Sequence, residues 1–149
     1  MKVMDIMQTG VVTIEPSTEI KEIAKTLYEN KISGVPVVNS SDQILGIISE
    51  GDLLHKETSP RVPDVVGVLG SLIYYRGVKQ YNSDFKKLIA LQASEIMTED
   101  VITIHKDAKI EDAASLMINN NVKLLPVVEN GKIIGVVSRM DIIKTLMED

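Results

Sequence analysis

Hydrophobic and polar positions follow the same order of patterns twice along this chain. Apolar residues at 20, 23, 24 and 27 have the i, i+3, i+4, i+7 spacing that predicts one stripe of an amphipathic helix, and the spacing returns at 110, 113, 114 and 117. A short β-branched run precedes each stripe, VVTI at 11–14 and VITI at 101–104, and such runs favour strands. The pattern therefore predicts two copies of a unit that opens with a strand and a helix.

Polar residues mark the expected ends of both helices. Ser17, Thr18 and Asp107 come just before the stripes and are candidate N-caps, because their side chains can accept hydrogen bonds from the free N–H groups of a first turn. Both stripes run into asparagine, at Asn30 in the first copy and at 119–121 in the second. Asparagine lets the chain leave helical geometry at little cost, so we expect the helices to end there.

Two more strands are expected after each helix. The apolar runs VPVV (35–38) and LPVV (125–128) are followed by the polar tips NSSD (39–42) and ENGK (129–132), which predict hairpin turns. The tips lead into ILGIIS and IIGVVS, and because these runs are apolar throughout we expect them to be buried on both faces. A helix follows each run, so each copy is predicted to be a βαββα unit.

The two copies match residue by residue. Shifting the sequence by 90 positions from Ile6 to Val38 gives 11 identities in 33 positions, and after one deletion the runs ILGIIS and IIGVVS also align. A unit of this size cannot bury its apolar face alone, so we expect the copies to pack against each other.

An insert separates the copies. The predicted organisation is a first copy at 1–55, an insert at 56–92 and a second copy at 93–149. Prolines in KETSPRVPD predict a loop at the start of the insert, and an apolar stripe through Phe85, Leu88 and Ile89 predicts a helix near its end. The apolar stretch after the loop needs a covering surface, either the core of the same molecule or, as we prefer, a second subunit.

The composition narrows the class of protein. The chain is 44% hydrophobic and 25% charged, which is typical of a globular protein, and with no Trp and one Phe its core must be aliphatic. The absence of cysteine removes disulfides, thiolate nucleophiles and Cys-ligated metals, and fits a reducing compartment. No stretch approaches the ~20 apolar residues of a membrane span, and the amino terminus lacks the hydrophobic run of a secretory signal. We therefore expect a cytoplasmic protein without a membrane segment.

Charge and motifs argue against nucleic-acid binding and catalysis. The net charge of −5 and the lack of a Lys or Arg run make nucleic acid an unlikely main partner. His55 and His105 lack metal-ligand spacing, and the chain contains neither a G-x-S-x-G elbow nor a Walker-type phosphate loop. We expect no metal site and no enzymatic activity.

A serine and an aspartate three residues apart recur at the end of the last strand of each copy, in GIISEGDLL (46–54) and GVVSRMDII (135–143). The simplest interpretation is a capping box at a helix start. A more specific interpretation is a ligand site, because exposed N–H groups at such a place attract anions and the serine can donate to a phosphate. The aspartate can accept two hydrogen bonds from a vicinal diol such as that of ribose. The two residue types together favour a nucleoside phosphate.

With these motifs in order, the chain resembles a tandem pair of CBS domains, the module named after cystathionine β-synthase. The resemblance rests on VVTI with VITI, ISGVPVV with VKLLPVV, and GIISEGD with GVVSRMD, and it leaves the insert outside. It implies an α/β (α+β) fold of two βαββα motifs related by a pseudo-two-fold axis. It also implies an adenosine derivative in the cleft between them, namely AMP, ADP, ATP or S-adenosylmethionine, and a flat homodimer.

The resemblance also implies roles for individual residues. Asp52 and Asp141 would hold the ribose, with Ser49 and Ser138 near ribose or phosphate. The backbone of two loops would read the adenine edge, and two threonines would line the same pockets; these residues are Ser33, Gly34, Val35, Lys123, Leu124 and Leu125 in the loops, with Thr13 and Thr103 in the first strands. For the threonines, a purely structural role as β-branched strand residues is equally consistent with the sequence.

The copies differ between the serine and the aspartate. Glu50-Gly51 stands in the first copy where the second has Arg139-Met140. Because Glu50 would oppose a phosphate and Arg139 would attract it, we expect the site around Asp141 to bind a phosphorylated ligand more tightly.

The expected function is a regulatory adenine-nucleotide sensor that acts through its dimer or through a partner protein. The alternative is a ligand-free interaction protein, in which the Ser-x-x-Asp boxes only cap helices and the apolar insert is the working surface.

Overall fold

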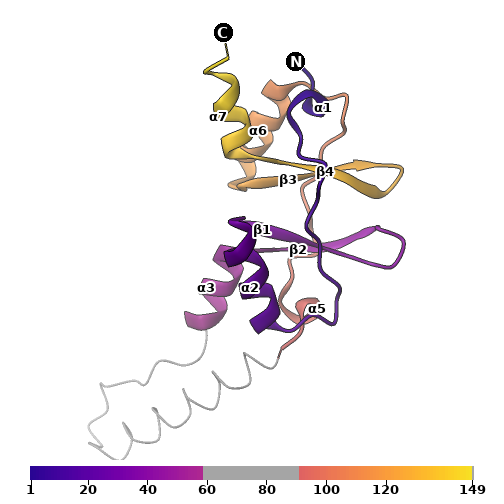
Figure 1. Cartoon of the computed structure of the whole chain (residues 1–149), viewed down its shortest axis with the longest axis vertical. Helices are drawn as coiled ribbons and strands as arrows, with labels where there is room; N and C mark the ends of the chain where they lie inside the picture. The colour runs from indigo at the N-terminus through magenta and orange to yellow at the C-terminus, as the bar shows by residue number, and fades with distance from the viewer. Residues whose placement is uncertain (59–90, 149) are drawn as a thin grey trace, which may run out of the picture.

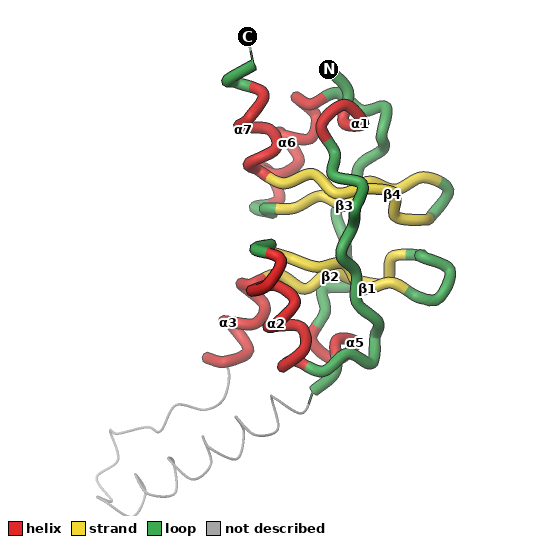
Figure 2. The backbone as a smooth tube through the Cα atoms, viewed as in Figure 1, coloured by secondary structure: helices red, strands yellow, loops and turns green. Residues whose placement is uncertain are grey.

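The computed structural model describes residues 1–58 and 91–148, and it contains two copies of one arrangement of helices and hairpins (Figures 1 and 2). The first half has α1 (Val3–Ile6), α2 (Ile20–Asn30), β1 (Gly34–Val38), β2 (Ile44–Ser49) and α3 (Glu50–Thr58). The second half has α5 (Ala93–Ile96), α6 (Ile110–Asn120), β3 (Leu124–Glu129), β4 (Lys132–Ser138) and α7 (Arg139–Thr145). The predicted helices and hairpins of both copies are confirmed.

Each half contains one antiparallel hairpin. Gly34 pairs with Ser49 at the open end of β1–β2, and Leu124 pairs with Ser138 at the same place in β3–β4. In the second hairpin Asn130 and Gly131 have φ values of 53° and 79°, which is the conformation that a two-residue type I′ turn requires. The predicted turn positions are therefore confirmed, and the two hairpins stack with their turns on the same side of the molecule (Figure 1).

The predicted first strands are reduced to one paired residue each. Ile14 bridges Val37 in parallel, and Ile104 bridges Val127 in the same way. A few residues earlier, Gln8 already pairs with Val136 of the other copy's hairpin. Because the segment between residues 8 and 14 must cross from one hairpin to the other, it cannot also run along β1 as a strand.

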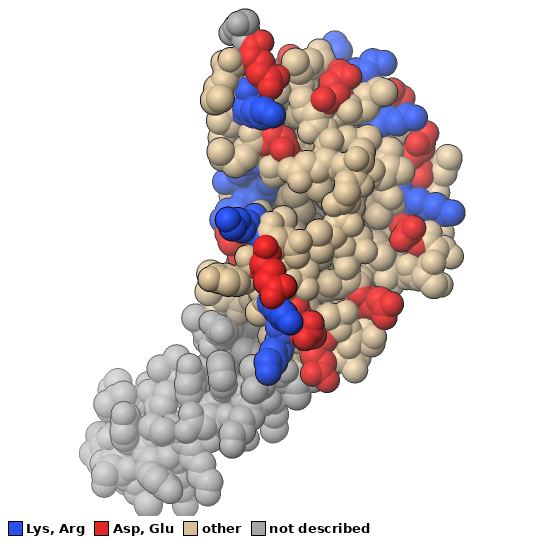
Figure 3. All heavy atoms as spheres, in the orientation of Figure 1, with Lys and Arg blue, Asp and Glu red and all other residues tan. Residues whose placement is uncertain are grey.

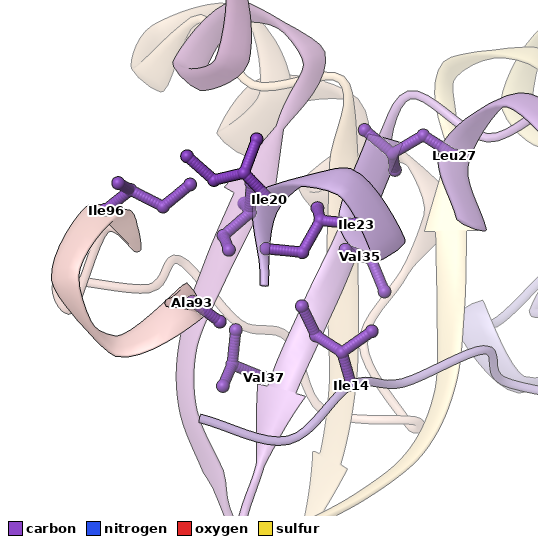
Figure 4. Packing of buried hydrophobic residues seen from close by; sticks show 9 residues of the cluster. Ile14, Ile20, Ile23, Leu27, Val35, Val37, Ala93 and Ile96 are labelled. Carbon is purple, nitrogen blue, oxygen red and sulfur yellow. The ribbon is translucent and has the colours of Figure 1, made fainter. Parts of the chain in front are cut away.

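The crossing segments exchange the short helices between the two halves. Val3 of α1 is fully buried in the core of the second half, with Leu125, Val127 and Val137. In return, Ala93 and Ile96 of α5 lie in the core of the first half, with α2 and β1 (Figure 4). Each core is therefore completed by a segment that precedes the other copy in the sequence.

The bridges outside the hairpins follow an approximate two-fold relation between the halves. When every residue is replaced by its repeat equivalent in the other copy, four of these bridges form two exchanged pairs. A fifth bridge joins two residues that are each other's equivalents, so it is unchanged. The pairs are Lys2↔Lys109 with Glu19↔Gln92, Gln8↔Val136 with Ile47↔Thr98, and Gln43↔Lys132 alone. The copies therefore pack face to face, as expected from the repeat.

Burial along the strands differs from the expectation. All five residues of β1 are buried, whereas β2 alternates: Ile48 is fully buried and Leu45 is 37% exposed. The expectation that ILGIIS and IIGVVS are buried on both faces is wrong, because each sheet has only two strands and β2 and β4 leave part of their surface to solvent.

The predicted C-terminal ends of α2 and α6 agree with the structure, but their predicted N-caps do not. Lys31 and Asn121 end α2 and α6 in the left-handed conformation, with φ of 53° and 52°, as the asparagine-rich ends predict. The predicted N-caps are wrong, since Glu19 and Lys109 occupy the cap positions. Thr18 lies before the helix instead and accepts a hydrogen bond from the Glu15 N–H in a turn, at 3.2 Å.

The helix α3 runs to Thr58, so it includes the first three residues of the predicted loop at 56–64. The rest of the insert, with its predicted helix and its apolar stretch, lies outside the described residues. Within the described part of the chain, no helix is long and apolar enough to cross a membrane.

Candidate functional site

The two Ser-x-x-Asp motifs form reciprocal capping boxes. Ser138 Oγ accepts from the Asp141 N–H at 3.2 Å, and Asp141 Oδ2 accepts from the Ser138 N–H at 2.8 Å. In the first half, Ser49 Oγ accepts from the Asp52 N–H at 3.1 Å, and Asp52 Oδ2 accepts from the Ser49 N–H at 2.9 Å. The capping interpretation therefore describes a real role of these residues, and it leaves open what else their carboxylates contact.

The first motif opens into a cavity of about 310 Å³, which we call the Asp52 pocket. Ser49 and Asp52 lie on one wall, and the loop that joins α6 to β3 forms another. The crossing segment before Ile104 closes a third side. The described lining consists of Ser33, Gly34, Ile47, Ser49, Glu50, Gly51, Asp52, Thr98, Asp100, Val101, Ile102, Asn121, Val122, Lys123 and Leu124.

The second motif opens into an equivalent cavity of about 380 Å³, the Asp141 pocket. Its walls are Ser138 and Asp141, the loop that joins α2 to β1, and the crossing segment before Ile14. The described lining consists of Gln8, Gly10, Val12, Asn30, Lys31, Ile32, Ser33, Gly34, Pro36, Leu124, Val136, Ser138, Met140 and Asp141. Both cavities fall within the roughly 300–1,000 Å³ typical of small-molecule sites. Each one combines the Ser-x-x-Asp motif of one copy with the helix-to-strand loop of the other.

The structure brings most of the predicted site residues to these pockets. Ser33, Gly34 and Leu124 line both, because they lie where the two loops meet between the halves. Lys123 lines the Asp52 pocket only.

Five predicted residues are not among the lining. Val35 and Leu125 are fully buried in the two cores, so their side chains are directed away from both pockets. Thr13 and Thr103 each follow a lining residue, Val12 and Ile102. Arg139 donates from Nε to the Val122 carbonyl at 3.3 Å and is absent from the wall of the Asp141 pocket.

Sequence reasoning missed a residue that contacts one of the two aspartates. Gln8 Nε2 donates to Asp141 Oδ1 at 3.0 Å and to Oδ2 at 3.1 Å. Gln8 lies in the crossing segment, and its repeat equivalent Thr98 lines the Asp52 pocket. The repeat alignment pairs Gln8 with Thr98 but does not reveal that this segment reaches the other copy, so it offered no signal for the contact.

Charged residues are distributed unequally around the pockets. Lys123 Nζ lies 3.1 Å from Glu50 Oε1, in an ion pair that joins the two halves at the Asp52 pocket. Asp100 also lines that pocket, whereas Lys31 lines the Asp141 pocket. Figure 3 shows basic and acidic side chains next to each other at the edge where the halves meet.

Other charged groups lie away from the pockets. On the opposite side of the second half, a 2.9 Å ion pair with Glu129 raises the pKa of Lys106 above its ordinary value. Among the described residues, no three His, Asp or Glu side chains are placed to hold a metal ion.

Comparison with known proteins gives a consistent result. The model of the CBS domain family matches residues 3–58 and 93–148. The uncharacterized protein MJ1426 of Methanocaldococcus jannaschii is 34% identical in an alignment of 157 positions that covers 99% of this chain and 92% of that protein. A second protein of that organism, MJ1232, is 35% identical but is matched over only 39% of its length, so the same unit also occurs within longer chains.

A solved structure shares the architecture. The crystal structure of CBSX2 in complex with AMP has a TM-score of 0.75 and 25% identity to this chain, and the match covers 99% of this chain and 96% of that one. CBSX2 is a CBS domain-containing protein of Arabidopsis thaliana.

Proposed function

Because this chain belongs to the CBS domain family, we propose that it is a regulatory module that binds adenosine derivatives in the two pockets between its halves. The observation that carries the proposal is the composition of each pocket: a carboxylate that can accept a ribose diol comes from one copy, and a loop backbone comes from the other. A ligand that fills a pocket therefore contacts both copies at once.

The residues have the following proposed roles. Asp52 and Asp141 accept hydrogen bonds from the 2′ and 3′ hydroxyls of ribose, and Ser49 and Ser138 hold those carboxylates in place through the capping boxes. The adenine edge is read by loop backbone, which is that of 123–125 in the Asp52 pocket and of 33–35 in the Asp141 pocket. Since Val35 and Leu125 are fully buried, they take part through backbone atoms alone.

The proposed ligands are AMP, ADP, ATP and S-adenosylmethionine. AMP is the first to test, because CBSX2 holds AMP in a structure of the same fold. Ligand binding can regulate this module only if the ligand has different affinities for two arrangements of the protein, because only then does it shift the equilibrium between them. Helices α2, α3, α6 and α7 lie on one side of the molecule (Figure 1) and offer a surface for such arrangements. The exposed apolar residues on these helices or directly after α7 are Tyr28, Leu54, Ile118, Met140, Ile143, Leu146 and Met147. We propose that this surface pairs two copies into a homodimer, or contacts a regulated partner protein.

Thermal unfolding with and without ligand tests the proposal. AMP, ATP and S-adenosylmethionine are added separately, with NAD as a fourth adenosine compound. A ligand at 100 times its dissociation constant adds ~2.7 kcal/mol to the free energy of unfolding, which gives a clear rise in melting temperature. Variants Asp52→Ala and Asp141→Ala should lose the response at one pocket each. If none of the four compounds raises the melting temperature, the proposal fails in favour of a ligand-free interaction protein.

A further inference from the structure

The two pockets differ in the charges that surround the proposed ligand, although they lie at equivalent places in the two copies. The Asp52 pocket is lined by Glu50, Asp52 and Asp100, and Lys123 is the one cation among its described lining residues. The Asp141 pocket has Asp141 and the cation Lys31 in its described lining. Among the described lining residues, acids therefore outnumber cations by two in the first pocket and are balanced in the second. Arg139 contacts the carbonyl of Val122 next to the first pocket but is not part of its lining.

The cation of the Asp52 pocket is already engaged. Lys123 Nζ lies 3.1 Å from Glu50 Oε1, and both side chains are about half exposed, at 55% and 51%. A ligand phosphate would have to take Lys123 from Glu50 and leave that carboxylate unpaired next to it. The ion pair therefore offers a phosphate no net gain of positive charge.

A nucleotide in this pocket cannot avoid the carboxylates. The cavity of about 310 Å³ is close to the lower limit for small-molecule sites, so an adenosine ligand fills it and contacts several walls. Any 5′ group then lies within the ~10 Å over which charges interact before salt screens them. One uncompensated charge at that distance changes affinity by on the order of tenfold at the effective dielectric of a protein surface.

Building on the proposed function, we infer that the Asp52 pocket selects adenosine ligands whose 5′ group carries no negative charge, and that phosphorylated ligands bind in the Asp141 pocket. The class of ligand for the Asp52 pocket is a 5′-thioether or 5′-sulfonium adenosine. The carboxylates of Glu50 and Asp100 act by repelling phosphate, which is specificity through rejection of the wrong ligand. Lys31, rather than the predicted Arg139, is the cation that favours phosphate at the Asp141 pocket.

Calorimetric titration of the full chain with three probes tests this inference: AMP, 5′-methylthioadenosine and S-adenosylmethionine. AMP binding should be lost in Asp141→Ala and kept in Asp52→Ala, whereas 5′-methylthioadenosine binding should show the reverse. Asp52→Asn and Asp141→Asn serve as second variants, because asparagine keeps an oxygen for the capping hydrogen bond if alanine prevents folding.

A charge change then tests the cause. Glu50→Gln with Asp100→Asn, in the Asp141→Ala background, should raise AMP affinity at the Asp52 pocket at least about tenfold. Glu111→Gln with Glu22→Gln removes two exposed acids that line neither pocket and is the matched control, for which we expect little change. Added salt should strengthen AMP binding and weaken S-adenosylmethionine binding at the Asp52 pocket.

The outcomes separate the inference from the function on which it rests. Equal loss of AMP and 5′-methylthioadenosine in both aspartate variants, or AMP binding in the Asp52 pocket alone, would overturn the inference and leave the proposed function standing. Absence of binding by all three probes to the unmodified protein would overturn both.

Discussion

Gln8 donates from one nitrogen to both carboxylate oxygens of Asp141, at 3.0 and 3.1 Å, across 133 positions of sequence. Asp141 also accepts from the N–H and the hydroxyl of Ser138, at 2.8 and 2.9 Å. The carboxylate that we assign to ribose in this pocket is thus already hydrogen-bonded to the protein. A ribose diol must displace the Gln8 amide before it can bind in the proposed manner.

Replacing Gln8 should therefore improve binding in the Asp141 pocket. A net contribution of about 0.5–1.5 kcal/mol for one hydrogen bond corresponds to a two- to tenfold gain in AMP affinity for Gln8→Ala. Calorimetric titration in the Asp52→Ala background isolates this pocket. The control is Thr98→Ala, which changes the equivalent position of the other crossing segment. It should leave AMP affinity at the Asp141 pocket unchanged. An affinity that does not rise in Gln8→Ala would mean that the amide stays in place when the ligand binds.

The capping role and the binding role of the aspartates can be separated by one methylene group. Glutamate at the third helical position also completes a capping box, so Asp141→Glu should change the free energy of unfolding by less than about 0.5 kcal/mol. The longer side chain moves the carboxylate relative to the ribose, and we expect at least tenfold weaker AMP binding. Denaturant unfolding and titration measure the two effects.

Ser138→Ala provides the complementary variant. It removes the cap oxygen and should cost ~1 kcal/mol in the same unfolding experiment. Equal AMP affinity in Asp141→Glu and the unmodified protein would show that the carboxylate serves only to cap α7.

The exchanged short helices should contribute to stability as core elements. Ile96 of α5 is 5% exposed within the core of the first half, so Ile96→Ala should lower the free energy of unfolding by about 2–5 kcal/mol. Met4, which is 47% exposed on the corresponding helix α1, is the control, and Met4→Ala should cost less than about 0.5 kcal/mol. Urea unfolding followed by circular dichroism measures both. Similar small effects would place α5 outside the cooperative core.

The turn of the second hairpin depends on backbone conformation at one glycine. Gly131 has φ +79°, and a Cβ added there would meet no atom within 4 Å. Gly131→Ala should therefore destabilise through backbone strain alone, by about 1–2 kcal/mol. Gly10 has equally open surroundings without a positive φ, and Gly10→Ala should be neutral or slightly stabilising. The melting temperatures of the two variants give the comparison, and equal values would contradict the strain argument.

The sequence predicted what depends on local pattern. The helical stripe through Ile23 and Leu27 and the Asn130-Gly131 turn each carry their own signal, and the repeat placed the same elements in both halves. The helices α1 and α5 have only four residues each, too few to show a period, and their burial depends on partners that are distant in the sequence and belong to the other half. For that reason the exchange of Val3 and Ile96 between the halves could not be read from the chain.

The candidate site divides in the same manner. Ser49, Asp52, Ser138 and Asp141 were identified from spacing, because a helix start fixes the positions of its caps. Which loop faces which aspartate follows from the two-fold packing, and the contact of Gln8 with Asp141 follows from the crossing segment. Arg139 shows the limit of reasoning by residue type. Its charge predicted a contact with a ligand phosphate, but its side chain donates a hydrogen bond to the Val122 carbonyl.

The exchange of α1 and α5 also bears on how such a molecule can arise. A protein with one copy alone would have an uncovered patch of core at the place where the short helix α1 or α5 of the other copy now packs. Such a protein could be stable only as a dimer in which each chain supplies its short helix to the core of the other. When both copies are joined in one polypeptide, the exchange of the short helices is intramolecular and no longer depends on protein concentration. A mutation in α1 or α5 would then first affect the core of the half that follows or precedes it as its packing partner: α1 acts on the second half and α5 on the first.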